Sequence, residues 1–217
     1  MTCSCSQVTT AAARHFDERR IRKELESYQS TGPGPTTRGL LTQILSQGPM
    51  PETVLDVGSG IGPMSLELLE AGVKRAICVD MSPAALAANA EEARRRGVDD
   101  RVEQVEADFV AIAPTLPVVD LVVLDRVVCC YPAYAPLLEQ ATARSRRLLA
   151  LAFPRDRWWV RLAMRIENAW RGIRGDDFRS FVHRPAAMAE VLRRGGFTRS
   201  GALATIAWQM ELYARNG

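Results

Sequence analysis

Residues 53–62, TVLDVGSGIG, constrain the fold of this chain more than any other stretch. A β-prone apolar run ends in three glycines at alternate positions, Gly58, Gly60 and Gly62, and apolar residues resume over 64–69. The pattern predicts a buried parallel strand, a tight turn and a helix, the first half of a βαβ unit. Glycine suits such a turn because its backbone takes positive φ and lets a ligand approach without meeting a Cβ atom.

Two other residues restrict the ligand of this turn. A dinucleotide-binding loop would have glycine at position 63, which is Pro63 in this chain. Asp56 lies two residues before the first glycine, where a carboxylate disfavours a pyrophosphate and favours a ligand with an ammonium and a sulfonium group. On this segment alone, an ordinary strand-to-helix turn is the alternative interpretation.

A second apolar segment, residues 75–80, is also predicted to be a strand that ends in a carboxylate. Asp80 follows Asp56 by 24 residues, close to the spacing at which a ribose-binding acid follows a glycine loop. A carboxylate at a strand end can accept hydrogen bonds from both ribose hydroxyls. Ser82 and Pro83 then predict the start of a helix, because serine caps helices and proline suits their first turn.

Two further predicted strands end in acids. Residues 101–109 end at Asp108 and Phe109, and residues 120–125 end at Asp125. The carboxyl ends of parallel strands meet at one edge, where open α/β sheets bind their ligands. The sequence therefore predicts that these acids and the glycine turn form one binding site.

The alternation of strands and helices predicts a Rossmann-like, doubly wound α/β fold with a mostly parallel sheet. A charged helix is expected over 11–29, and a second helix is expected from a cap at Thr36 or Thr37 to Gly48. Residues 197–201 and 204–213 are expected to add an antiparallel last pair of strands. We expect residues 1–48 to form a tail and lid helices, and 49–217 to form the binding domain.

Composition narrows the class of protein. The 217 residues are 47% hydrophobic and 24% charged, as in soluble globular proteins, and the net charge of +3 does not indicate nucleic-acid binding. The chain shows neither a signal-peptide pattern nor an apolar run of membrane-spanning length, so a cytoplasmic location is expected. Five cysteines, an odd number, favour free thiols, with Cys3 and Cys5 in a reduced tail and no metal site.

Residues 155–184 form an unusual insertion between a predicted strand at 147–153 and a helix at 185–194. They contain eight arginines, four acids and three of the four tryptophans. Apolar residues and arginines fall on separate faces of a helix over 157–173. Three interpretations are open: a covering helix with a solvated basic face, a cap over a flat acidic substrate, or a peripheral membrane contact.

With these residues in view, most of the chain resembles the class I S-adenosylmethionine (SAM) methyltransferases. Within them it is similar to the magnesium protoporphyrin O-methyltransferases, in the region of Tyr28, in the segment from Asp125 to Tyr131 and Pro132, and in residues 178–183. One departure is that Cys130 stands where that family tends to have histidine. The resemblance implies a seven-stranded sheet with an antiparallel last strand and SAM as cofactor.

The resemblance also implies roles for individual residues. Asp108 would accept a hydrogen bond from the adenine amino group, and Phe109 would cover the ring. The expected cofactor-binding residues are the strand-end acids, the turn and their neighbours: Asp56, Gly58, Ser59, Gly60, Gly62, Asp80, Met81, Asp108, Phe109 and Asp125. Tyr28 is expected in a roof over the site, while His183 or Tyr131 would orient the acceptor.

The predicted function is SAM-dependent methylation, at oxygen, of a small acidic or aromatic acceptor. Magnesium protoporphyrin IX is a narrower alternative for that acceptor. A nucleotide-dependent oxidoreductase and a non-catalytic SAM-binding or interaction protein are rival functions. His183 could be a general base or contact the acceptor, and a structural role is its alternative, since a lone histidine is more often structural than catalytic. The alternative for Tyr28 is an interfacial aromatic residue with its hydroxyl in water.

Overall fold

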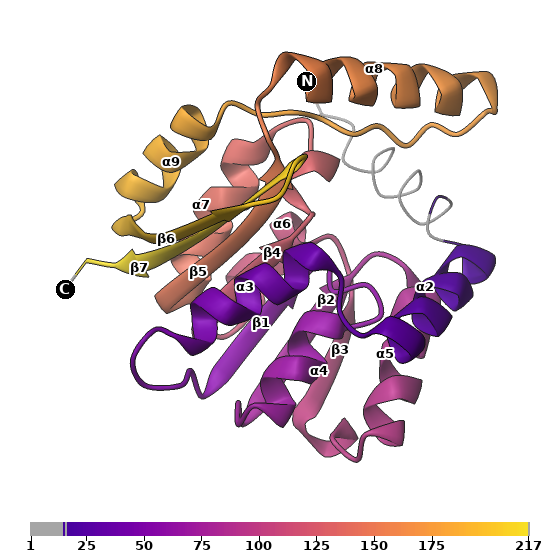
Figure 1. Ribbon diagram of the computed structural model, residues 1–217. Helices are drawn as coiled ribbons and strands as arrows, with labels where there is room; N and C mark the ends of the chain where they lie inside the picture. Colours follow the sequence, from indigo (N-terminus) through magenta and orange to yellow (C-terminus); the bar gives the residue numbers. More distant parts are fainter. Residues whose placement is uncertain (1–14, 16, 217) are drawn as a thin grey trace.

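Seven strands form a single sheet in the order β3-β2-β1-β4-β5-β7-β6 (Figure 1). This computed structural model describes residues 15 and 17–216. The strands are β1 (Thr53–Val57), β2 (Arg75–Asp80), β3 (Val102–Glu106), β4 (Val119–Asp125), β5 (Ser145–Pro154), β6 (Phe197–Ala204) and β7 (Trp208–Arg215). Strands β1 to β5 pair in parallel, and β7 runs antiparallel to β5 and β6. The predicted Rossmann-like sheet with an antiparallel last strand is confirmed.

Helices cover both faces of the sheet. One face carries α2 (Glu18–Thr31), α3 (Pro35–Leu45), α4 (Pro63–Glu70) and α5 (Pro83–Arg95), and the other carries α6 (Phe109–Ile112), α7 (Tyr134–Arg144) and α9 (Pro185–Arg194). Successive strand residues point to opposite faces, so Val54 packs with the first group and Leu55 with the second. Both side chains are fully buried, and each such burial stabilises the fold by about 1.5–3 kcal/mol.

The first N-terminal helix differs from its predicted bounds of 11–29. In the described part of the chain α2 runs from Glu18 to Thr31, and Gly32, at φ 74°, follows it. Its apolar residues Ile21 and Tyr28 are buried. Residues 11–14 and 16 of the predicted helix lie outside the described residues, as do Cys3 and Cys5.

The second N-terminal helix begins earlier than predicted. Helix α3 starts at Pro35 with Gly34 as its N-cap, so the prediction of a cap at Thr36 or Thr37 was wrong. Proline suits the first helical position because it lacks only an N–H that would have no intrahelical partner there. Thr37 donates its hydroxyl to Asp125 Oδ2 at 2.6 Å instead, which ties α3 to the end of β4.

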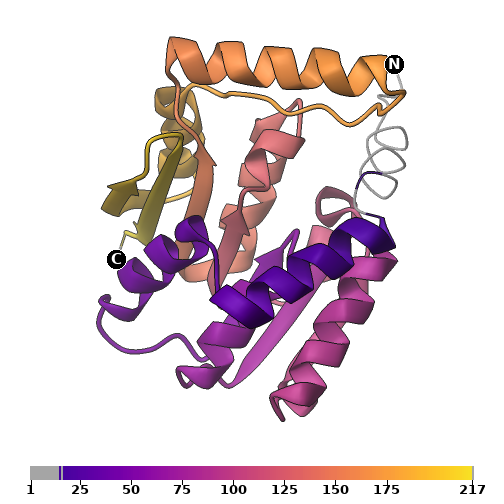
Figure 2. The same ribbon diagram turned by 45° about the vertical axis from the view of Figure 1, so that its right-hand side comes forward.

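Helix α8 (Trp158–Ile173) forms most of the predicted insertion and lies at the outside of the molecule in both views (Figures 1 and 2). Residues beyond its end return along it, and Asn168 exchanges two hydrogen bonds with the backbone of Ser180, at 2.8 and 2.9 Å. Within the described residues, no helix combines the length and the apolar character needed to cross a membrane. The division at residue 48 stays a prediction, although α3 packs against β5 and β7 as part of the covering layer.

Candidate active site

A cavity of about 760 Å³ lies where the carboxyl ends of β1, β2 and β4 meet. Helix α2 and the start of α3 line it on one side, and α8 lines it on another. The strand ends contribute Asp56, Asp80 and Asp125 to its wall. The sequence-based prediction that these three acids share one site with the glycine turn therefore agrees with the structure.

The glycine turn has the backbone conformation that its residues require. Gly58, Gly60 and Gly62 have φ of 61°, 57° and 79°, which side chains disfavour. A Cβ at Gly58 would lie 2.6 Å from Val127 Cγ2, and one at Gly62 would lie 1.7 Å from Asn89 Nδ2. At Gly60 no atom lies within 4 Å of that position, so this glycine opens to the cavity. Gly62 does not line the cavity and serves the packing of α4 against α5.

Asp80 is held in place by the backbone around it. Its Oδ2 accepts from the Gly60 N–H and its Oδ1 accepts from the Ser82 N–H, both at 2.8 Å. Burial raises the pKa of Asp80, and these hydrogen bonds oppose that effect. Each carboxylate oxygen has a second lone pair, so Asp80 can still accept hydrogen bonds from a ligand. Ser82 also caps α5, as predicted.

Asp56 is buried at the centre of the site, with 2% of its surface exposed. Burial, reinforced by the negative charge of Asp125, raises the pKa of Asp56 to about 7. Asp125 Oδ1 and the Ser59 hydroxyl are buried and have no hydrogen-bond partner among the described residues. Arg126 Nε lies 3.9 Å from Asp125 Oδ1, which is too long for a hydrogen bond. The site thus holds negative charge that a cationic ligand would neutralise.

Asp108 was predicted to lie at the end of a strand, but it lies beyond the end of β3. Strand β3 ends at Glu106, and Asp108 is the N-cap of α6, accepting from the Val110 N–H at 3.0 Å. Its Oδ1 also accepts from the Tyr131 hydroxyl at 2.9 Å. Tyr131 and Phe109 line the cavity, whereas Asp108 does not. Asp108 therefore positions the hydroxyl of Tyr131.

Comparison with known proteins identifies the part of the chain that carries this site. A family model described as "Methyltransferase domain" matches residues 54–150. Residues 54–150 form a methyltransferase domain. This domain contains β1 to β4 with the glycine turn and all three strand-end acids.

Curated relatives match this chain over less than half of its length. Ribosomal protein L11 methyltransferase of Alteromonas mediterranea is 39% identical over 88 residues, 37% of this chain and 30% of that protein. Release factor glutamine methyltransferase of Cereibacter sphaeroides is 41% identical over 102 residues, 46% of this chain and 35% of that protein. The chain thus spans about a third of the length of the curated relatives that it matches.

A solved structure matches the fold over almost the whole chain. Magnesium protoporphyrin IX methyltransferase (ChlM) of Synechocystis PCC 6803, with bound SAH, has a TM-score of 0.76 and 18% identity, covering 96% of this chain and 100% of that one. The match shows a shared fold that extends from the methyltransferase domain into the flanking helices.

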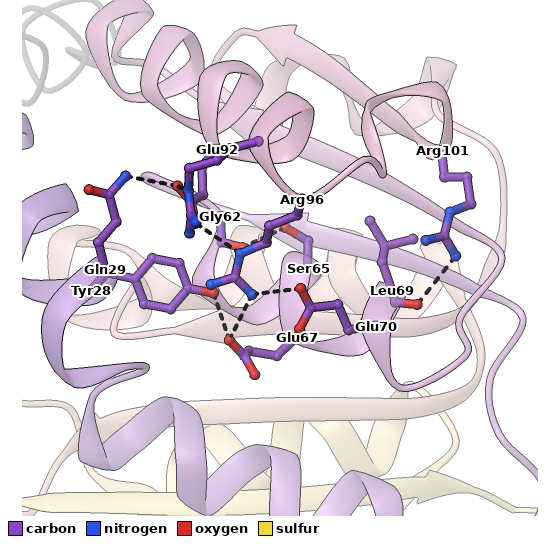
Figure 3. Close-up of polar contacts among 11 residues, drawn as sticks. Tyr28, Gln29, Gly62, Ser65, Glu67, Leu69, Glu70, Glu92, Arg96 and Arg101 are labelled. Atoms are coloured by element: carbon purple, nitrogen blue, oxygen red, sulfur yellow. Dashed lines mark hydrogen bonds and ion pairs between the residues drawn. The ribbon is translucent and has the colours of Figure 1, made fainter.

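Tyr28 lines the cavity of the methyltransferase domain, and its hydroxyl points into an ionic network (Figure 3). The hydroxyl donates to Glu67 Oε1 at 2.7 Å, and the guanidinium of Arg96 lies 4.8 Å from the ring centroid. Arg96 also pairs with Glu67 at 3.2 Å and with Glu92 at 2.8 Å. Burial raises the pKa of Tyr28. A hydroxyl in water, the alternative considered from the sequence, is excluded, and the structure assigns Tyr28 to anchoring α2 on α4 and α5.

His183 does not line the cavity, so the prediction that it contacts the acceptor or acts as a base disagrees with the structure. Its Nε2 lies 2.9 Å from the Tyr131 carbonyl and 3.2 Å from the Val128 carbonyl, and its ring packs against Tyr134. A donated hydrogen bond to these carbonyls fixes the segment that carries Tyr131. His183 is therefore a positioning residue.

A histidine that no sequence pattern indicated, His15, lies at the site. His15 lines the cavity, its Nδ1 lies 2.6 Å from Asp176 Oδ2, and its ring stacks on Phe178 at 4.3 Å. Burial lowers the pKa of His15, so the imidazole is neutral at pH 7. No pattern could have paired two residues 161 positions apart, because only the return of the chain after α8 brings them together.

Proposed function

We propose that this chain transfers a methyl group from SAM to an oxygen of a small, flat, acidic acceptor. The observation that supports this proposal is that acidic and basic side chains line the same cavity. Three strand-end carboxylates line it, and arginine side chains from α2, from the segment after β4 and from α8 line it as well. A cationic methyl donor and an anionic acceptor can both be bound in such a cavity.

The cofactor would be held by the residues of the glycine turn and the strand ends. Asp80, fixed by two backbone N–H groups, would accept from the ribose hydroxyls. Asp56 and the unpartnered Asp125 Oδ1 would stabilise the positive charges of the methionine part. When bound, SAM supplies a methyl carbon already activated by its sulfonium. Of the residues predicted from the sequence to bind the cofactor, Gly62 and Asp108 do not line the cavity. The others do: Asp56, Gly58, Ser59, Gly60, Asp80, Met81, Phe109 and Asp125.

The acceptor would lie against arginine and apolar side chains. Within the described part of the chain, the ion pairs of Arg126 are long, 3.7 Å to Glu24 and 3.9 Å to Asp125, and its side chain is half exposed. Met164 of α8 and Trp208 of β7 supply apolar area in the same cavity. A guanidinium beside apolar side chains suits a planar molecule that carries a carboxylate.

The available bases favour a carboxylate as the methylated group. A carboxylate is ionised at neutral pH and needs no base, whereas a hydroxyl benefits from one. The hydroxyls of Tyr28 and Tyr131 are donated to Glu67 and Asp108, and burial raises the pKa of both tyrosines. Neither tyrosine is therefore a base at neutral pH. Tyr28 and Tyr131 would instead help to exclude water from the cavity and to hold the acceptor oxygen in line with the methyl group.

A hydroxyl acceptor is the second candidate, and the His15–Asp176 pair is the observation that favours it. A carboxylate on Nδ1 fixes the tautomer of a histidine and stabilises its protonated form, as in other base-assisted reactions. His15 would then accept the proton of a phenolic hydroxyl. Under this mechanism the rate of methyl transfer would depend on His15. Methylation of a carboxylate would not depend on His15, because a carboxylate needs no base.

Relatives supply specific acceptors to test. The Synechocystis protein with the same fold is a magnesium protoporphyrin IX methyltransferase, so a porphyrin carboxylate is the first flat, acidic acceptor to assay. The sequence relatives act on ribosomal protein L11 and on release factor, by their names. Protein acceptors therefore form the second class.

The test is transfer of labelled methyl from SAM to extract fractions and to magnesium protoporphyrin. A low-molecular-mass product whose label is released as methanol by alkali identifies a carboxylate ester. A product that resists alkali and depends on His15 identifies a hydroxyl acceptor. Label in the protein fraction alone overturns the small-acceptor proposal. Binding of SAM without transfer to any fraction supports the non-catalytic rival, and binding of NAD in place of SAM supports the oxidoreductase.

A further inference from the structure

Helix α8 carries its apolar residues on the face that points to solvent. Six large apolar side chains are between 37% and 79% exposed: Trp158, Trp159, Leu162, Ile166, Trp170 and Ile173. At 100° per residue they fall within about 120° of arc. This apolar stripe is continuous along the full 16 residues of α8.

The body of the protein lies on the opposite side of the helix. Val160 is the only buried residue of α8, and Met164 and Arg171 line the cavity. These three residues fall roughly opposite the stripe on the helical wheel. Of the three interpretations open from the sequence, the covering helix requires its apolar face to pack on the protein, whereas the structure leaves that face exposed.

Arginines lie along both edges of the stripe. Arg161 and Arg165 are exposed on one edge, and Arg174 on the other, with its guanidinium 4.6 Å from the centre of the Trp170 ring. Tryptophan and arginine together suit the boundary between lipid headgroups and acyl chains, because each has an apolar body and a polar end. A water-exposed protein surface rarely keeps an apolar patch of this length without a partner.

We infer that the α8 stripe binds the surface of a lipid bilayer that contains anionic headgroups. The apolar side chains enter the headgroup and acyl boundary, and the arginines at the edges contact the negative headgroups. The helix lies in the plane of the membrane, because its arginines flank the stripe along its length. The cavity then lies on the far side of α8 from the lipid, with Met164 and Arg171 facing it.

The test is sedimentation of the full chain with vesicles of phosphatidylcholine, with and without phosphatidylglycerol. No SAM or acceptor is added, so the result is independent of methyl transfer. The protein should sediment with the anionic vesicles and much less with neutral ones. Replacement of Leu162 by glutamate should lower vesicle binding at least about tenfold, because a charge replaces an inserted apolar side chain. Arg165→Gln and Arg174→Gln should each lower it about fivefold.

The matched control is Leu45→Glu. Leu45 is 46% exposed at the end of α3, and Leu162 is 49% exposed, so both substitutions place the same charge at a similarly exposed leucine. Leu45→Glu should leave binding unchanged. Circular dichroism checks that each variant is folded.

Three results would overturn the inference. The first is equal binding to neutral and anionic vesicles, which removes the role of the arginines. The second is equal loss in Leu45→Glu and Leu162→Glu. The third is the absence of vesicle binding together with a dimer in light scattering that Leu162→Glu converts to a monomer, which would show that a second copy of the chain covers the stripe.

Discussion

The hydroxyl of Tyr28 donates a 2.7 Å hydrogen bond to Glu67 Oε1 and thereby joins α2, which borders the cavity, to α4, which follows the glycine turn. Both side chains also contact Arg96. The position of α2 over the cavity therefore depends on an ionic network on the flank of the sheet (Figure 3).

Tyr28→Phe should lower the free energy of unfolding by about 1–2 kcal/mol, because Glu67 loses a donor while the ring is kept. Urea unfolding measures this change. If Tyr28 only positions α2, kcat should stay within about threefold, whereas loss of a catalytic acid or base would lower it about 10²-fold or more. A large fall in kcat at unchanged stability would contradict the positioning role.

Asp80→Asn should weaken SAM binding about 10- to 100-fold, because hydrogen bonds to a charged acceptor are lost while the shape is retained. Isothermal titration calorimetry measures the affinity. Asp99→Asn, at an exposed acid in the turn after α5, is the control and should bind SAM normally. Unchanged affinity in Asp80→Asn would refute the cofactor assignment.

SAM affinity should rise as pH increases through about 7, where Asp56 loses its proton in the ligand-free protein. The cationic ligand favours the carboxylate, so a proton is released on binding below this pH. Calorimetry in buffers of different ionisation enthalpy measures that proton. An affinity independent of pH between about 6 and 8 would contradict the role of Asp56.

Asp56→Asn should stabilise the ligand-free protein above pH 7. The pKa of Asp56 is about 7 in the folded protein and 3.8 in the reference state, so its stabilising contribution is complete below pH 3.8 and is lost as pH rises to about 7. The difference corresponds to at most about 4 kcal/mol. Thermal unfolding at pH 8 and pH 5 measures it, and the gain should be larger at pH 8.

Arg126→Gly should raise the free energy of unfolding by up to about 1 kcal/mol, because Arg126 has φ of 64°, a conformation that glycine adopts without strain. The same change should raise KM for an acidic acceptor through loss of the guanidinium. Arg126→Ala is the matched control, since it loses the guanidinium and keeps the strained backbone. Equal stability of the two variants would rule out backbone strain as the cause.

Iodoacetamide should modify Cys130 before Cys78. Cys130 lines the cavity, and a hydrogen bond from Cys129 lowers its pKa, whereas burial raises the pKa of Cys78 to about 12. Peptide mapping by mass spectrometry follows each thiol, and Cys3 and Cys5 are read separately. SAM should slow modification of Cys130 if cofactor and thiol share the cavity. Faster reaction of Cys78 would contradict the described burial.

Features that depend on neighbouring residues could be predicted from the sequence. The bounds of β2 and α9, the cap at Ser82 and the turn at Gly58 to Gly62 follow from local apolar patterns and backbone requirements. Because parallel strands align their carboxyl ends, the gathering of Asp56, Asp80 and Asp125 followed from the same patterns. The bounds of α2 and α3 did not, since Gly34 rather than a threonine caps α3.

Side-chain partners distant in the sequence were decided by tertiary structure alone. Tyr28 lines the cavity and His183 does not, and packing directs their polar atoms to Glu67 and to backbone carbonyls. The His15–Asp176 pair joins residues on separate elements, and no local pattern encodes such a contact. The amphipathic pattern of α8 was evident in the sequence. Which face of the helix is exposed to solvent depends on how α8 packs against the rest of the protein. The sequence by itself determined the sheet and its acidic edge, because both follow from the periodicity of apolar residues. Only the tertiary structure decided the orientation of each side chain, because that orientation depends on packing between segments distant in the sequence.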